Sequence, residues 1–265
     1  MLLLLSPAKT LDYETRVPAP VAKKATEPLF ADRAAELIAV LRKKTPAQVA
    51  ALMDLSDKLA ALNVGRYAAW APQATPDNSK PAALAFDGDV YDGLQARALK
   101  AADLDWAQEH VVILSGPYGA LRPLDRLQPY RLEMGTALKT ARGKHLYAYW
   151  GDTVAQYLNQ RQADERAPVV VNLASIEYSR VVPRPALKAR VVDVTFLEGE
   201  DGEAKVISFF AKKARGLLAR HAITKRARSV KALEDFSAAG YALDRERSSP
   251  SSLVFRRPAQ AQPAA

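Results

Sequence analysis

The sequence predicts a mixed α/β (α+β) fold, a single compact domain in which a mixed β-sheet is flanked by helices. Short apolar runs rich in Leu, Val and Ile alternate with amphipathic stretches, which is the pattern of a sheet covered by helices. The pair Asp201-Gly202 lies between two strand-like runs and is a hairpin signal, so part of the sheet should be antiparallel. No internal repeat or long linker interrupts the 265 residues, which favours one domain over 1–256.

The elements follow in order along the chain. The runs that read as strands are Leu2–Leu5, Val111–Leu114, Val169–Leu173, Val191–Leu197 and Val206–Phe210. The stretches that read as helices are Ala31–Lys44, Thr45–Trp70, Thr153–Gln162 and Ala211–Ile223. Tyr241–Arg257 reads as a further hairpin with a polar turn at Ser248–Ser252, and residues 257–265 read as a disordered tail.

Residues 45–70 contain two helix starts. Thr45 can cap a helix that begins at Pro46, and Gln48 completes a capping box. Ser56, eleven residues further on, can cap a second helix. The caps favour two short helices joined by a tight hairpin, and the leucines at helical spacing leave one continuous helix as the alternative.

The hairpin interpretation would create a phosphate site. Leu52–Ala60 is similar to the core of helix-hairpin-helix DNA binders, in which backbone N–H groups, a helix N-terminus and a lysine face a phosphate. Leu55, Lys58 and Ala60 match that pattern, whereas an aspartate and a serine replace its two glycines. No base edge is read in this mode, so binding should be independent of sequence and sensitive to salt.

Positive charge is concentrated near one helix. The net charge is +9 and the pI about 9.6, which favours a polyanionic partner. Lys212–Lys231 contains eight Lys or Arg and no acidic residue, so it is either a track for a phosphate backbone or a solvated basic face. The candidate DNA-binding residues are Ser56, Lys58, Asn63, Arg66, Lys212, Lys213, Arg215 and Arg220.

Polar loops follow several of the predicted strands, at Ser6–Thr10, Ser115–Gly135 and Asn172–Tyr178. Loops at strand ends are where α/β proteins build ligand sites, so a small pocket for an anion or a nucleotide is possible here. The alternative is a set of buried ion pairs that fix a long loop, such as Arg122 with Asp125. The candidate pocket residues are Lys9, Ser115, Tyr118, Arg122, Arg131, Glu133, Asn172 and Glu177.

Several classes of function are disfavoured by composition. The chain has no cysteine, which excludes thiol peroxidase chemistry and thiolate metal sites. His110, His145 and His221 are scattered, and no P-loop occurs, so we expect no metal, no cofactor and no catalytic residues. No run approaches the roughly 20 apolar residues of a membrane helix, so we expect no membrane partner.

Five segments together resemble the YaaA peroxide-stress protein family: Ser6–Tyr13, Phe86–Leu94, Leu114–Gly135, Asn172–Tyr178 and Phe209–Arg220. They appear in family order and cover nearly the whole chain. The resemblance implies a cytoplasmic bacterial protein that limits damage by hydrogen peroxide and helps hold down free iron. It also implies a mixed α/β fold with a positively charged cleft, a helix-hairpin-helix element and binding to duplex DNA.

The leading hypothesis is therefore a cytoplasmic, monomeric stress-response protein that binds double-stranded DNA without strong sequence specificity and has no enzymatic activity. Lys58 and the Ser56 cap are the positions that the resemblance carries over to the hairpin. The alternative is an enzyme that processes a nucleotide or nucleobase in the strand-end pocket. The small-molecule ligand, if there is one, is not identified by the sequence.

Overall fold

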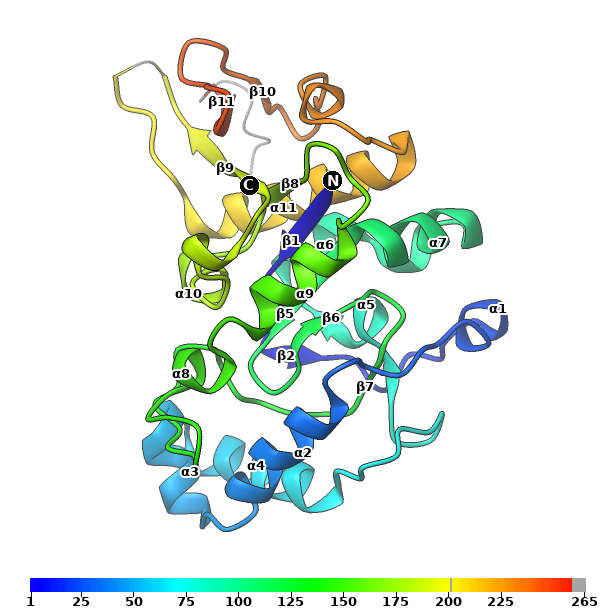
Figure 1. The fold of residues 1–265 in the computed structure, drawn as a ribbon, viewed down its shortest axis with the longest axis vertical. Coiled ribbons are helices and arrows are strands. Elements are labelled where there is room, and N and C mark those ends of the chain that lie inside the picture. Colours follow the sequence, from blue (N-terminus) through cyan, green and yellow to red (C-terminus); the bar gives the residue numbers. More distant parts are fainter. Residues whose placement is uncertain (201, 259–265) are drawn as a thin grey trace.

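The computed structural model describes residues 1–200 and 202–258. Its core is a seven-stranded sheet in the order β10-β11-β9-β8-β1-β5-β6 (Figure 1). The sheet strands are β1 (Leu2–Leu5), β5 (Val111–Ser115), β6 (Gly119–Leu121), β8 (Val169–Asn172), β9 (Arg190–Glu198), β10 (Ala242–Leu243) and β11 (Ser252–Arg257). The five inner strands are parallel and the two edge strands antiparallel, so the predicted mixed sheet is confirmed.

The centre of the sheet is built from the most apolar strands. All four leucines of β1 are buried, and Leu3 stands opposite Val111 of β5 and Val171 of β8. Parallel strands covered by helices on both faces read as continuous apolar runs, which is why these segments were recognisable in the sequence. Two small antiparallel ladders lie beside this sheet: β2 (Thr10–Leu11) with β4 (Phe86–Asp87), and β3 (Lys80–Pro81) with β7 (Arg126–Leu127).

Helices of very different lengths surround the sheet. The helices of eight residues or more are α2 (Ala31–Leu41), α3 (Pro46–Met53), α4 (Asp57–Ala69), α7 (Ala101–His110), α9 (Thr153–Arg161) and α11 (Ser208–Lys225). The shorter ones are α1 (Ala19–Ala22), α5 (Ala82–Ala85), α6 (Asp89–Leu94), α8 (Leu146–Trp150) and α10 (Ile176–Ser179). Figure 1 shows α3 and α4 at one end of the long axis and β9, β10 and β11 at the other.

Helices α6 and α11 touch through their backbones. A Cβ atom added at Gly216 would lie 1.8 Å from the carbonyl oxygen of Val90, and one added at Gly93 would lie 2.1 Å from that of Lys213. No side chain fits into either gap, so a glycine on each helix allows this close approach. The contact fixes the first half of α11 against α6.

Residues 45–70 form two helices rather than one. The Thr45 hydroxyl accepts a hydrogen bond from the backbone of Gln48, and the Gln48 side chain completes the capping box. Asp54 ends α3 in the left-handed region at φ 52°, and Ser56 caps α4. A continuous helix is excluded because the left-handed residue reverses the chain direction.

The prediction of a strand at Val206–Phe210 is wrong, because α11 begins at Ser208. Val206 and Phe209 are 53% and 56% exposed, so the apolar run does not enter the sheet. In the described part of this region, pairing is reduced to one isolated bridge between Glu198 and Lys205. The turn residue Asp201 lies outside the described residues, and the antiparallel pairs of the main sheet occur at its edges instead.

The predicted C-terminal hairpin is present as β10 and β11. Strand β11 extends through Arg257, one residue into the segment expected to be a tail. The Arg257 guanidinium is buried and makes an ion pair of 2.7 Å with Glu198 on β9. Residues 259–265 of the expected tail lie outside the described residues. Across residues 1–200 and 202–258, no helix combines the length and the apolar character needed to cross a bilayer.

Candidate functional site

A cleft of about 500 Å³ opens at the carboxyl ends of β1 and β8. The chain leaves β1 for β5 on one side, and β8 lies on the other side of β1. Such a boundary between oppositely directed connections is where open α/β sheets usually bind ligands. The residues used below that line the cleft are Ser6, Lys9, Asp87, Asp89, Ser175, Glu177, Lys212 and Arg215.

The floor of the cleft is a fixed set of polar groups. The backbone N–H of Ser175 donates to the Ser6 hydroxyl at 2.9 Å, and that hydroxyl lies 3.4 Å from the Ser175 hydroxyl. Ser175 also caps the short helix α10. The Tyr91 hydroxyl donates to the Ser6 carbonyl oxygen at 3.1 Å. These bonds tie the loops after β1 and β8 together, so the floor needs no ligand to hold its shape.

Most charged groups around the cleft already have partners. Lys9 lies 3.0 Å from a Glu133 carboxylate oxygen, and Lys212 lies 3.7 Å from one of Asp89. A Glu177 carboxylate oxygen accepts a hydrogen bond of 2.9 Å from the backbone N–H of Gly135. The lysines therefore contribute positive potential at the cleft while they remain within ion pairs.

Arg215 is different from these groups. Its side chain projects from α11 into the cleft lining and is half-buried, and its Nε has no hydrogen-bond partner among the described residues. Burial lowers the pKa of the guanidinium, and no nearby carboxylate opposes that effect. A half-buried cation without a counter-ion leaves its hydrogen-bonding capacity for another molecule.

A series of cations connects the cleft with the helical hairpin. Burial lowers the pKa of Arg66 on α4, and the charge of Arg131 lowers it further, so the two cations lie within electrostatic range of each other. Arg131 lies 3.1 Å from Glu133, which is also the partner of Lys9. The Tyr67 hydroxyl of α4 donates to the carbonyl oxygen of Arg131. The hairpin is thus anchored beside the residues that lead into the cleft.

Of the hairpin residues predicted to bind DNA, some are exposed and one is buried. Lys58 is exposed, and the Ser56 hydroxyl accepts from the backbone N–H of Leu59 at 3.5 Å as a helix cap. Asn63, expected to contact DNA, is fully buried. Its side chain donates to the Leu59 carbonyl and accepts from Arg66 at 3.3 Å, so it orients Arg66 and has no surface for DNA.

The candidate DNA-binding residues of α11 also lie in different surroundings. Lys212 and Arg215 face the cleft, whereas exposed Lys213 lies on the other side of α6, over a second hollow that includes Asp12. Arg220 donates to the carbonyl oxygens of Leu94 and Gln95 at 3.1 and 3.0 Å. Those carbonyls end α6, so Arg220 serves the packing of α6 on α11.

The pocket predicted from eight residues is not assembled as one site. Lys9 and Glu177 line the cleft, with Glu133 and Arg131 next to Lys9. Ser115 and Tyr118 are buried away from it: Ser115 bonds the Tyr130 hydroxyl at 2.7 Å, and Tyr118 accepts from the Trp70 indole at 2.9 Å. The Asn172 amide donates to Asp193 at 2.8 Å.

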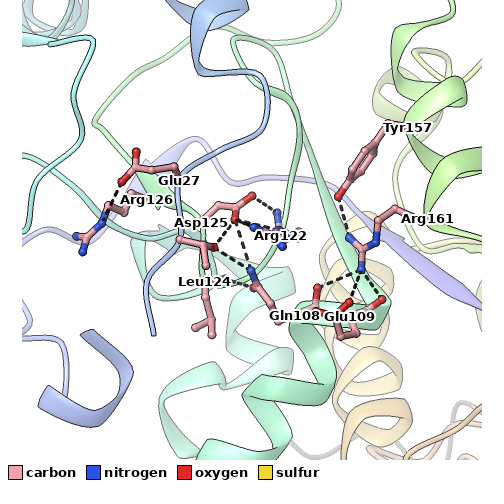
Figure 2. A network of polar contacts seen from close by, with 10 residues as sticks. Glu27, Gln108, Glu109, Arg122, Leu124, Asp125, Arg126, Tyr157 and Arg161 are labelled. Atoms are coloured by element: carbon pink, nitrogen blue, oxygen red, sulfur yellow. Dashed lines mark hydrogen bonds and ion pairs between the residues drawn. The ribbon is translucent and has the colours of Figure 1, made fainter. Parts of the chain in front are cut away.

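Arg122 belongs to a buried ion pair, which was the alternative interpretation of its loop. Figure 2 shows the Asp125 carboxylate in contact with both Arg122 and Gln108. Asp125 is 1% exposed and accepts from Arg122 Nε at 3.2 Å and from the Thr26 hydroxyl at 2.6 Å. Burial raises the pKa of this carboxyl, and the hydrogen bonds from Arg122 and Thr26 oppose the rise. The network fixes the loop and lies outside the lining of the cleft.

Sequence reasoning missed the acidic side of the cleft and its serine floor. Asp87 and Asp89 come from the segment Phe86–Leu94, which we used for the family resemblance without assigning it a role. Gly93 and Gly216 were the sequence signal that could have predicted the backbone contact between α6 and α11. Throughout residues 1–200 and 202–258, no group of three or more His, Cys, Asp or Glu is arranged to hold a metal ion.

Comparison with known proteins places this chain among close relatives. A family model described as Peroxide stress protein YaaA matches residues 1–247. A UPF0246 protein of Leptothrix cholodnii is 64% identical over 257 residues, which are 97% of this chain and 98% of the relative. A UPF0246 protein of Variovorax paradoxus is 59% identical over 260 residues, 97% of this chain and 99% of the relative. A Bordetella avium UPF0246 protein is 58% identical over 257 residues, with 97% and 99% covered.

Proposed function

Because this chain belongs to the peroxide stress protein YaaA family, we propose that it acts in the peroxide stress response by binding double-stranded DNA in the cytoplasm. It binds as a monomer without reading sequence, and it limits damage by covering the duplex. The observation that carries the proposal is the series of cations from the hairpin to α11, through Lys58, Arg66, Arg131 and Lys9.

The hairpin supports a contact with one phosphate. Helix α4 has thirteen residues, and its N-terminus offers backbone N–H groups next to exposed Lys58. Helix N-termini and a lysine together attract a phosphate without selecting a base. Asp54 and Asp57 stand at the same turn, and their negative charge weakens this contact relative to a glycine-rich hairpin.

The start of α11 supports a second group of contacts. Lys212 and Lys213 are both exposed on its first turns, Lys212 at the cleft and Lys213 over the second hollow, so each can reach a phosphate without unfolding any element. Their contacts add to those at the hairpin, because each phosphate that a lysine or arginine neutralises releases counterions from the duplex. Affinity in this mode depends on how many cations contact phosphates and not on the base sequence of the duplex.

A titration of a labelled duplex by fluorescence anisotropy, at two salt concentrations, tests the proposal. The variant Lys58→Ala/Lys212→Ala/Lys213→Ala should bind more weakly, and the slope of log affinity against log salt should fall by about three. The matched control Lys23→Ala/Lys188→Ala/Lys205→Ala removes the same charge from exposed positions outside the series and outside Lys212–Lys231, and it should keep the wild-type slope. Full binding by the first variant, or binding that salt does not weaken, would contradict the proposal.

A further inference from the structure

We propose that the cleft beside Arg215 is a binding site for a small organic anion, a phosphate or carboxylate that also carries hydrogen-bond donors. The proposal does not depend on duplex binding. It rests on the unpaired guanidinium, on the carboxylates that line the same cleft and on the preformed polar floor. The volume of about 500 Å³ lies within the range of small-molecule sites, about 300–1,000 Å³.

The first step is the state of Arg215 without a ligand. Two other arginines with little exposure each have a carboxylate partner: Arg257 pairs with Glu198, and Arg131 pairs with Glu133. Arg215 is half-buried and has neither an ion pair nor a hydrogen bond to any described residue, and burial alone shifts its pKa. An uncompensated cation in this position costs free energy of folding, which an anion in the cleft would restore.

The second step concerns which other cations are available. Lys9 and Lys212 line the same cleft but are held by Glu133 and Asp89. They strengthen the field around an anion without needing to bond it directly. Arg215 is therefore the group that would bond the ligand, and its planar fork can bond two oxygens of a phosphate or carboxylate at once.

The third step concerns the rest of the ligand. Asp87, Asp89 and Glu177 line the cleft, and the Asp87 carboxylate makes no ion pair with any described residue. Carboxylates accept hydrogen bonds and cannot donate them when ionised. A ligand that presents only anionic oxygens would meet repulsion here, so the fitting molecule has hydroxyl or amine groups at the end away from Arg215.

Thermal unfolding and calorimetric titration of the full chain, without DNA, test this site. The probes are ribose 5-phosphate, gluconate, inorganic phosphate and the neutral sugar ribose. We expect ribose 5-phosphate or gluconate to raise the melting temperature, inorganic phosphate to do so less, and ribose to have no effect. The two hydroxylated probes distinguish phosphate from carboxylate recognition.

Arg215→Met removes the charge and keeps an unbranched apolar stem. It should melt at a higher temperature than the wild type without a probe, because the unpaired buried charge is gone, and it should lose the shift with every probe. Arg215→Lys keeps the charge without the fork and should bind about tenfold more weakly. Arg166→Met, the same change at an exposed arginine outside the cleft, should keep the full shift.

Two results would overturn the inference. One is a shift of equal size in the wild type and in Arg215→Met, which would place the probe elsewhere. The other is the absence of any shift in the wild type with all three anionic probes. Because no duplex is present, neither result bears on the DNA-binding proposal, and loss of duplex binding would leave this inference intact.

Discussion

At the scale of single residues, the presence of a partner decides what a charged side chain does. Arg122 and Arg257 are both paired with buried carboxylates and serve the fold. Among the described residues Arg215 has no such partner, and it faces a cleft. The sequence contains all three as equivalent basic residues, and only contacts between distant segments separate them. This is why Arg220 and Asn63 were predicted to bind DNA although their polar groups are used internally.

Asp12 gives a prediction for pH dependence. Desolvation raises the pKa of its carboxyl, but hydrogen bonds from Thr15 and the charge of Lys80 outweigh that effect and lower it below the ordinary 3.8. An acid with a lowered folded pKa stabilises the fold above its unfolded pKa, and the gain disappears as pH falls through the folded pKa. We expect Asp12→Asn to cost the same unfolding free energy at every pH above about 5, and progressively less below 4.

Urea unfolding of both proteins between neutral and acidic pH measures this difference. Asp164→Asn, at an exposed aspartate, is the matched control and should show no dependence of that kind. A difference between Asp12→Asn and the wild type that grew as the pH fell would contradict the expected sign.

At the scale of elements, local sequence signals gave the split of residues 45–70 into two helices correctly and one strand wrongly, and they missed α7 and the shorter helices α1, α5, α6, α8 and α10. The capping residues Thr45 and Ser56 predicted where α3 and α4 begin, because helix capping depends on residues within one turn. The run Val206–Phe210 has the composition of a strand, but no strand of the described sheet pairs with it, and it begins α11. Composition alone cannot separate a short apolar run in a helix from one in a strand.

The contact between α6 and α11 gives a second prediction. In Gly216→Ala the new methyl group would meet the backbone of Val90, which cannot move aside as a side chain would. We expect a loss of about 3 kcal/mol in unfolding free energy. The matched control is Gly65→Ala in α4, where a Cβ meets nothing within 4 Å. That change should stabilise the protein by about 0.5–1 kcal/mol, because alanine favours a helix interior over glycine.

Urea denaturation of both variants measures the contrast. Equal effects of the two alanines would show that helix propensity, and not contact between backbones, controls Gly216. If Gly216→Ala displaces α11, it should also weaken the binding of any probe that contacts Arg215, because Arg215 directly precedes Gly216.

At the scale of the whole molecule, the order of strands brings together segments that are far apart in the chain. The cleft combines loops that follow β1 and β8 with the start of α11. The class of fold and most central strands were predictable, since apolar composition is local. The strand order was not, because it depends on which strands pair, and pairing energies between distant segments leave no local pattern.

Arg257 gives a prediction at this scale, because it joins the last strand to β9. Arg257→Ala would leave Glu198, which is 2% exposed, as a buried charge with only the Tyr241 hydroxyl as partner. We expect a loss of about 3–5 kcal/mol in unfolding free energy. Adding Glu198→Gln should recover part of the loss, since the orphaned charge is removed. Thermal or urea unfolding checks both, and an unchanged stability in Arg257→Ala would contradict the role assigned to the pair.

Strand β11 also has a consequence for how the protein is made. It is the last strand of the described residues, yet it lies between β9 and β10, within the sheet. During translation, β1, β5, β8 and β9 leave the ribosome first, so β9 has an open edge until β11 emerges. Open edges recruit other chains. A message truncated near codon 250 should therefore give an insoluble product, although the cleft and the hairpin would already be encoded.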